Sequence, residues 1–284
     1  MRIAILGATG LLGRALVPAF AGHECRGYGS ADIDIRDASQ IRSALEGFHP
    51  DWTILAAAYT DVDGAEKNPE AVLAINREGA CNVARATRDC GSHLLFLSTD
   101  YVFDGSQRTP YETDDSRCPI NLYGRSKAEA EEQILKILPD TCIVRTSWLF
   151  GLGRQCFPDT ILRKAAEGRS LRVVDDQRGS PTLTDDLARA IVQLAEQRAC
   201  GIVHVTNQGE CSWYEFAEAL VADAGLHTQI TPVGTAEFVR PARRPAYSVL
   251  SGHSRNAFGI SMASWQDAAK RYVAARAQLD RAES

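Results

Sequence analysis

The sequence of 284 residues lacks any paired cysteine motif, although it contains eight cysteines. No two of them form a C-x-x-C pair, and the cysteines and histidines show no clustered spacing of the kind that binds zinc. A chain of this length buries a core large enough to fold without disulfide bonds. We therefore expect free thiols, no metal site and a cytoplasmic protein.

Long apolar runs and an excess of basic charge are also missing. No apolar run approaches about 18 residues, and residues 1–6 lead into a glycine loop without the apolar core of a secretion signal. The 31 Lys and Arg residues are outnumbered by 36 Asp and Glu residues, giving a net charge of −5. We expect neither a membrane nor a nucleic acid as partner. Most basic residues are arginines, which codon preference explains, but arginine also suits bidentate binding of phosphate.

The first half of the chain alternates apolar, strand-like runs with amphipathic, helix-like stretches. This alternation is typical of an α/β fold with a parallel sheet that is covered on both faces. Right-handed crossovers then give a doubly wound sheet whose ligand crevice lies at the carboxyl ends of its strands. The expected strands are 2–6, 24–28, 52–58, 93–98 and 142–148, and the expected helices are 11–21, 37–47, 69–90 and 125–138.

After about residue 150 the pattern becomes irregular. We expect helices at 157–168, 184–198, 212–225 and 264–280, strands at 171–174 and 201–207, and a Pro- and Arg-rich stretch at 240–252. The segment 184–207 resembles the first-half pattern. We therefore predict a Rossmann domain made of residues 1–150 and about 184–207, and a smaller, irregular α/β domain made of about 151–183 and 208–284.

The stretch "GATGLLG" follows the first strand and places glycines at positions 7, 10 and 13. Backbone N–H groups at such a strand-to-helix turn favour a pyrophosphate, and glycine permits close approach. Alone, G-x-x-G-x-x-G also fits a structural turn, but its place at the start of an α/β chain favours a dinucleotide site. Asp34 and Ile35 are candidates to flank the adenine. No acidic residue ends the strand 24–28, so NADPH and NADH both remain candidate cofactors.

Two further segments carry residue types suited to proton transfer. The strand 93–98 runs into "STDY", which places Thr99 at a carboxyl end of the sheet. Tyr123 and Lys127 are four residues apart at the start of a helix and so face the same side. We expect the Lys127 ammonium to lower the pKa of the Tyr123 phenol, which then exchanges a proton with a carbonyl or alcohol oxygen during hydride transfer. Y-x-x-x-K alone is common by chance on solvent-facing helices, and its combination with the Ser/Thr strand end and the glycine loop favours catalysis.

The chain resembles the dTDP-4-dehydrorhamnose reductase family of the extended short-chain dehydrogenase/reductases. The resemblance covers nearly the whole chain in family order. The matching segments are "GATGLLGRAL" (7–16), "AAAYTDVDGAE" (56–66), "AINREGACNVA" (74–84), "LSTDYVFDG" (97–105), "PINLYGRSKAEAE" (119–131), "VRTSWLFG" (144–151), "DDQRGSPT" (175–182) and "RRPAYSVL" (243–250).

The resemblance implies NAD(P)H-dependent reduction of the C4 keto group of dTDP-4-dehydro-L-rhamnose to dTDP-L-rhamnose, with the second domain binding the nucleotide-sugar. Tyr123 would be the proton donor, with Lys127 and Thr99 completing the catalytic set. Cofactor contacts are implied for Gly7, Gly10, Leu11, Leu12, Gly13, Asp34, Ile35, Ala58, Tyr59, Thr60, Tyr123 and Lys127. Substrate contacts are implied for Thr99, Asp100, Trp148 and Arg244. Asn76 is expected to hold backbone near the site.

Several alternatives stay open. Arg240 and Arg243 are either further ligands of the substrate diphosphate or solvent-facing loop residues. Some family members dimerise through magnesium-binding acidic residues, but Arg14 and Ala15 stand near the glycine loop here, so we expect a monomer or a weak homodimer. Another nucleotide-sugar reductase or epimerase is an alternative function, whereas a dehydratase would need a second acid at Tyr101. A non-catalytic regulatory subunit resembling that of methionine adenosyltransferase is the alternative from another class.

Overall fold

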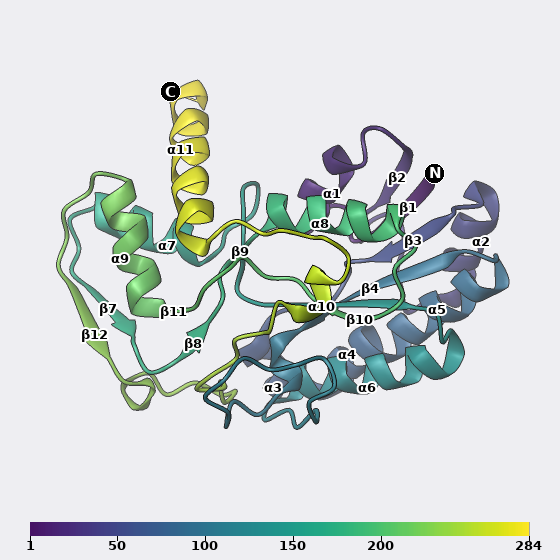
Figure 1. Ribbon diagram of the computed structural model, residues 1–284, viewed down its shortest axis with the longest axis horizontal. Coiled ribbons are helices and arrows are strands. Elements are labelled where there is room, and N and C mark those ends of the chain that lie inside the picture. Colours follow the sequence, from purple (N-terminus) through teal and green to yellow (C-terminus); the bar gives the residue numbers. More distant parts are fainter. Residues whose placement is uncertain (284) are drawn as a thin grey trace.

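Six parallel strands form the central sheet of the computed structural model, which describes residues 1–283 (Figure 1). Their order is β10-β5-β4-β3-β1-β2. The chain runs from β1 to β2 at one edge and then returns to β3 on the other side of β1. This reversal opens a crevice at the carboxyl ends of β1 and β3. The strands are β1 (Arg2–Leu6), β2 (Glu24–Tyr28), β3 (Trp52–Leu55), β4 (His93–Thr99), β5 (Cys142–Thr146) and β10 (Gly201–His204).

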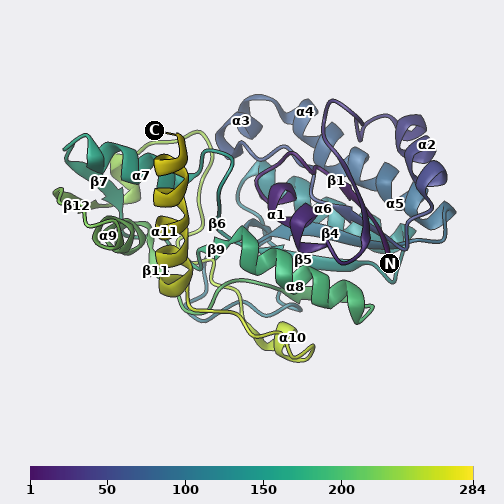
Figure 2. The same cartoon turned by 90° about the horizontal axis from the view of Figure 1, so that it is seen from above.

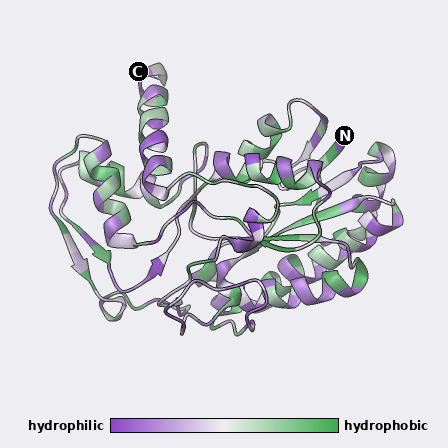
Figure 3. Cartoon of the chain, in the orientation of Figure 1, coloured by the Kyte–Doolittle hydropathy of each residue, from purple (hydrophilic) through white to green (hydrophobic). Residues whose placement is uncertain are grey.

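Helices cover both faces of this sheet (Figure 2). On one face lie α1 (Gly13–Ala19) and α8 (Thr184–Glu196), whose apolar residues pack with those of the strands in one core cluster. On the other face lie α2 (Ala38–Phe48), α5 (Ala80–Asp89) and α6 (Leu122–Ile137), which share a second cluster with the strands. Coverage of both faces explains why the inner strands β1, β3, β4 and β5 are largely apolar (Figure 3), whereas the edge strand β2 carries Glu24 and Arg26.

The expected helix at 69–90 is divided into three consecutive pieces. They are α4 (Pro69–Leu73), a π-helical segment η1 (Ala74–Gly79) and α5. A π-helical turn inside an α-helix shifts the register of the side chains, and such turns are frequent at functional sites. Here the π-helical segment carries the buried Asn76.

A second lobe lies beside the sheet (Figures 1 and 2). Its core is formed by α7 (Phe157–Ala166), α9 (Trp213–Asp223) and the start of α11 (Trp265–Glu283). Three two-stranded pairs complete it: β7 (Leu171–Val174) with β12 (Ile230–Val233), β8 (Arg178–Gly179) with β11 (Cys211–Ser212), and β6 (Leu149–Phe150) with β9 (Thr182–Leu183). The remaining elements are α3 (Val62–Lys67), α10 (His253–Asn256) and the 3-10 turns η2 (Asp100–Val102) and η3 (Thr235–Glu237).

The prediction of a doubly wound α/β sheet is confirmed, and the expected long elements are found within a few residues of their bounds. Three strands end earlier than expected, and one of them is β10, which ends at His204 instead of 207. β3 ends at Leu55 and β5 at Thr146, so Ala56–Ala58 and Ser147–Trp148 leave the sheet and line the crevice. Short elements such as α3 and β12 had no periodic pattern long enough to predict them.

All eight cysteines are free thiols. Within residues 1–283, no group of three or more His, Cys, Asp or Glu side chains is arranged to hold a metal ion. The helices of the same region include none with the length and apolar character required to cross a membrane.

Candidate active site

A cavity of about 920 Å³ opens along the carboxyl ends of the central strands and extends toward the second lobe. It brings together segments that lie far apart in the sequence. Most of the predicted site residues line it: Gly7, Gly10, Leu11, Leu12, Asp34, Ile35, Ala58, Thr60, Thr99, Asp100, Tyr123, Lys127 and Trp148. Gly13, Tyr59 and Arg244 do not line the cavity.

The glycine turn at one end of the cavity uses its three glycines differently. Gly7 has a φ of +93°, and a Cβ there would lie 2.5 Å from the backbone nitrogen of Ala57. Gly10 donates its N–H to the Gly7 carbonyl, and α1 begins at Gly13. Gly7, Gly10, Leu11 and Leu12 thus line the cavity beside the start of a helix, an arrangement that suits the pyrophosphate of a dinucleotide.

Gly13 supports this turn from behind. A Cβ at Gly13 would lie 2.1 Å from the carbonyl oxygen of Gly7 and 2.6 Å from the Cα of Ala8. Both are backbone atoms, so Gly13→Ala has to displace the turn itself. We expect NADPH to bind about 10- to 100-fold more weakly, since overpacking of this kind costs about 1–3 kcal/mol. A fluorescence titration with NADPH measures the change. Gly22→Ala, which meets no atom within 4 Å, is the matched control and should bind like wild type.

The end of the cavity beside β2 carries Arg36, which no sequence motif indicates. Asp34 and Ile35 line the cavity as predicted residues, and Arg36 lines it beside them. The Arg36 guanidinium donates to the Asp34 carboxylate at 2.9 and 2.5 Å, and these hydrogen bonds lower the pKa of Asp34. Asp32 instead accepts the N–H of Gly29 within a turn, and Asp37 caps the start of α2. The Asp34 carboxylate is thus neutralised by the Arg36 guanidinium, and this pair suits either NADH or NADPH.

Asn76 fixes the backbone that follows β3. Its side chain accepts the N–H of Tyr59 at 2.8 Å and donates to the carbonyl of the same residue at 3.1 Å. It also donates to the Ser126 hydroxyl, which in turn donates to the Tyr123 carbonyl. Ala58 and Thr60 on either side line the cavity. The Tyr59 backbone is therefore held by Asn76 and does not itself reach the cavity wall.

Thr99, Asp100 and Tyr123 lie together at the end of β4. The Thr99 hydroxyl donates to the Asp100 carboxylate at 2.9 Å and is also a hydrogen-bond partner of the Tyr123 phenol. Asp100 is 2% exposed, and its second carboxylate oxygen is buried without a hydrogen-bond partner. A hydroxyl and a phenol side by side can hold and protonate one substrate oxygen.

Burial is the main cause of the shifted pKa values of Tyr123, Asp100 and Lys127. It raises the pKa of Tyr123 to about 12, with a further contribution from Asp100, and raises the pKa of Asp100 to about 7. It also lowers the pKa of Lys127 to about 7. The expectation that Lys127 lowers the pKa of Tyr123 is therefore wrong for this structure. A buried lysine with a pKa of about 7 is only partly charged near pH 7, and the loss of solvation is the main cause of the raised phenol pKa. A neutral phenol is the form that can donate a proton.

Lys127 lies over an aromatic ring and one helical turn from a carboxylate. Its Nζ atom is 4.0 Å from the ring centroid of Phe96, and the Glu131 carboxylate favours its charged form. Lys127 lines the cavity on the same side of α6 as Tyr123. It is thus placed to donate hydrogen bonds to hydroxyl groups of a ligand.

The Asp100 carboxyl makes the ligand-free protein less stable at high pH. Its pKa is about 7 in the folded state and 3.8 in the reference state. As pH rises from 3.8 to 7 the unfolded chain loses a proton that the folded chain keeps, so the free energy of unfolding falls. We expect Asp100→Asn to gain stability over wild type, with the difference growing by about 2 kcal/mol between pH 5 and pH 8. Urea denaturation at both pH values measures this, and a difference independent of pH would contradict it.

The far end of the cavity is lined by stacked aromatic residues. Trp148, which adopts a φ of +48°, stacks on Trp213 with 3.6 Å between ring centroids. Gly179 leaves space for the same indole, because a Cβ there would lie 2.4 Å from it. Since both faces of Trp148 are covered, it presents an edge to the cavity. Trp213, Arg154 and Gln155 also line this end. The sequence analysis missed them, since their roles depend on contact between distant segments.

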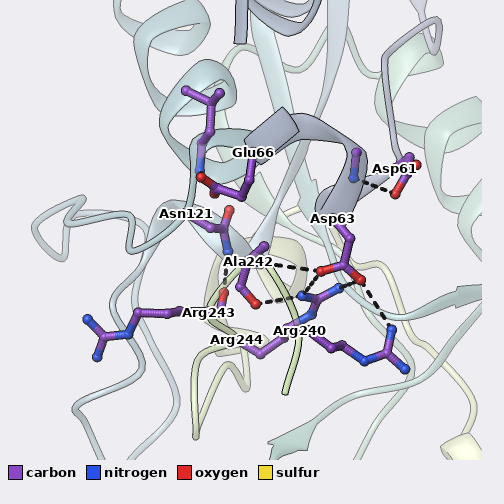
Figure 4. Close-up of polar contacts among 10 residues, drawn as sticks. Asp61, Asp63, Glu66, Asn121, Arg240, Ala242, Arg243 and Arg244 are labelled. Atoms are coloured by element: carbon purple, nitrogen blue, oxygen red, sulfur yellow. Dashed lines mark hydrogen bonds and ion pairs between the residues drawn. The ribbon is translucent and has the colours of Figure 1, made fainter. Parts of the chain in front are cut away.

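Arg244 is turned toward α3 (Figure 4). Its guanidinium donates to both carboxylate oxygens of Asp63, at 2.5 and 2.9 Å. Arg240 donates to the same carboxylate at 3.3 Å, whereas Arg243 contributes its carbonyl to Asn121. None of these three arginines lines the cavity.

Comparison with known proteins agrees with this geometry. The sequence model of the family described as RmlD substrate binding domain matches residues 1–278. The chain is 39% identical to the spore coat polysaccharide biosynthesis protein SpsK of Bacillus subtilis, over 97% of this chain and 98% of that protein. It is 39% identical to a dTDP-4-dehydrorhamnose reductase of Streptomyces griseus, over 90% and 87%. The crystal structure of dTDP-4-dehydrorhamnose reductase from Bacillus anthracis in complex with NADP is 36% identical, with a TM-score of 0.93 and coverage of 95% and 98%.

Proposed function

Because this chain belongs to the dTDP-4-dehydrorhamnose reductase family, we propose that it reduces the C4 keto group of dTDP-4-dehydro-L-rhamnose to give dTDP-L-rhamnose, with NADPH or NADH as hydride donor. The observation that carries the proposal is the grouping of Thr99 and Tyr123 at the same cavity that the glycine turn opens into. The cofactor, when bound, supplies the hydride, and the chain's own residues supply the proton and the position of the substrate.

The proton comes from Tyr123. Its phenol is neutral across the physiological range because burial raises its pKa to about 12. As hydride reaches C4, negative charge develops on the sugar oxygen, and a phenol within hydrogen-bond distance can protonate it. Thr99 holds the same oxygen in place. Lys127, which lines the cavity on the same side of α6, is placed to hold ribose hydroxyls of the cofactor.

The two lobes divide the binding task in this proposal. The glycine turn, the β2 end with Asp34 and Arg36, and the Ala58–Thr60 segment would hold the cofactor. Trp148 and Trp213 would contact the nucleotide-sugar, with the buried Asp100 accepting a sugar hydroxyl on its unpartnered oxygen. We further propose a monomer or weak homodimer in a reducing, cytoplasmic setting, which the eight free thiols support.

A direct assay tests the proposal. Purified protein is mixed with NADPH or NADH and dTDP-4-dehydro-L-rhamnose, and other 4-keto nucleotide-sugars serve as comparisons. We expect stoichiometric oxidation of the cofactor and a product that NMR identifies as dTDP-L-rhamnose. Sugar interconversion without net cofactor consumption would indicate an epimerase. Absence of turnover together with co-purification of a synthetase would favour a regulatory subunit.

A further inference from the structure

The segment Arg240–Arg244 of the second half of the chain is fastened to two helices of the first half (Figure 4). At α3, the Asp63 carboxylate accepts hydrogen bonds from Arg244, Arg240 and the Ala242 N–H. At the start of α6, the Asn121 side chain donates to the Arg243 carbonyl at 2.9 Å. We term this contact area, made by Asp63, Asn121 and residues 240–244, the clasp. Its residue Asn121 lies two positions before Tyr123 in the chain.

Within the clasp, the pair of Asp63 and Arg244 is the strongest contact. The Arg244 side chain is 14% exposed and makes a bidentate ion pair, while Arg240 is 58% exposed and makes one longer contact. The ion pair lowers the pKa of Asp63 to about 2, so the carboxylate stays charged at every pH at which the protein would be assayed. Separating this mostly buried guanidinium from Asp63 so that it could bind another anion would cost free energy.

Arg244 also contacts Tyr101, which lines the cavity. Its guanidinium is a hydrogen-bond partner of the Tyr101 hydroxyl. Tyr101 lines the cavity and packs edge-on against Tyr123, with 6.1 Å between ring centroids. The Tyr101 carbonyl also touches the first turn of α6, because a Cβ at Gly124 would lie 2.0 Å from it. Tyr101 therefore lies between Arg244 and the proton donor.

The first turn of α6 is held from the same side. The Leu122 N–H donates to the Glu66 carboxylate of α3 at 2.8 Å, and the Gly124 N–H donates to the Asn121 side chain at 2.8 Å. Both α3 and the clasp thus restrain the helix end that carries Tyr123.

We propose that Arg244 is a positioning residue: Asp63 holds its guanidinium against Tyr101, and Tyr101 fixes the place of Tyr123 in the active site. This role replaces the direct contact with the substrate diphosphate that the sequence predicts for Arg244. The inference rests on the proposed function, because the reaction reports the position of Tyr123. It extends the reductase's catalytic apparatus to Asp63, which lies outside the cavity.

Steady-state kinetics of four variants test the proposal. We expect Asp63→Asn, Arg244→Met and Tyr101→Phe each to lower kcat about tenfold to a hundredfold with little change in KM, because small misplacements of reacting groups slow chemistry. The Asp63→Asn/Arg244→Met double variant should be no slower than the slower single variant, as residues in one chain of contacts are not additive. Arg172→Met removes an exposed ion pair with Glu237 and is the matched control, with wild-type kcat.

Direct binding of the diphosphate predicts the opposite pattern. Removal of Arg244 would then raise the Kd for dTDP at least about tenfold, and Asp63→Asn would free the guanidinium and tighten binding. Calorimetric titration with dTDP distinguishes the two, and we expect unchanged affinity in both variants. Weaker dTDP binding by Arg244→Met, or full activity of Tyr101→Phe, would overturn the inference. Wild-type turnover tests the proposed function separately, and the dTDP titration remains informative without turnover.

Discussion

Tyr123→Phe is expected to lower kcat about 10²- to 10⁴-fold, the range that a positioned general acid contributes. The substitution removes only the hydroxyl, so the ring keeps its edge-on contact with Tyr101. The glycine turn and the Arg36 end of the cavity are untouched, and NADPH should bind as it does to wild type. Stopped-flow measurement of NADPH oxidation gives the rate, and a fluorescence titration gives the affinity.

Tyr214→Phe is the matched control for this variant. Tyr214 lies on α9, and its hydroxyl hydrogen-bonds only to Glu218 on the same exposed surface. It should keep wild-type turnover. If Tyr123→Phe also retained its turnover, Tyr123 would not be the proton donor, and water or Asp100 would become the next candidate.

Glu131→Gln is expected to cost about 3–5 kcal/mol of folding free energy, because it leaves a buried guanidinium without its counter-charge. Glu131 and Arg145 are 0% and 1% exposed. The Arg145 guanidinium donates to the two carboxylate oxygens at 2.9 and 2.7 Å. The same carboxylate accepts the Ser98 hydroxyl at 2.5 Å. Nearby His204 cannot replace it, because an imidazole carries no negative charge; burial lowers its pKa to about 3 and leaves it neutral.

Urea denaturation measures this loss, with Glu129→Gln on the same helix as the control. Glu129 pairs with Arg125 and Arg77 near the surface, so its loss should cost less than about 1 kcal/mol. Replacing both Glu131 and Arg145 with Met should cost less than Glu131→Gln, since the buried Arg145 guanidinium is then not left without its counter-charge. If Glu131→Gln and Glu129→Gln lowered the free energy of unfolding by equal, small amounts, the expected cost of an unpaired buried guanidinium would be contradicted.

The sequence predicts the sheet better than the lobe beside it. The apolar strands and long helices of the first half have strong periodic patterns, and α6 with its Tyr123–Lys127 pair lies where those patterns indicate. The π-helical segment Ala74–Gly79 could not be predicted, because its sequence is helical and only buried contacts with Tyr59 and Ser126 explain its register. The strand β12, which contains Pro232, carries almost no local signal.

Site residues divide in the same way. Those in a strand-end motif, such as Gly7 and Thr99, can be assigned to the cavity from the chain order alone. Trp213 and Arg154 require the second lobe to be placed against the sheet, which no local pattern provides. The direction in which an arginine side chain points is hardest to predict. Arg244 lies in a segment that matches the family, but the contact with Asp63, about 180 positions away, determines where its guanidinium points. Protonation likewise depends on burial, as the raised pKa of Tyr123 illustrates.

The position of β10 and α8 has a consequence for recombination among relatives. These elements complete the sheet and one of its covering layers, although they follow β6 to β9 of the second lobe in the chain. A crossover at residue 150 would therefore separate Leu187 and Ile191 of α8 from Ile3 and Ile5 of β1, which share one core. The lobes are not exchangeable as contiguous blocks. A chimera that keeps this core intact takes 184–207, and also the segment that carries Ile260 and Met262, from the same parent as β1.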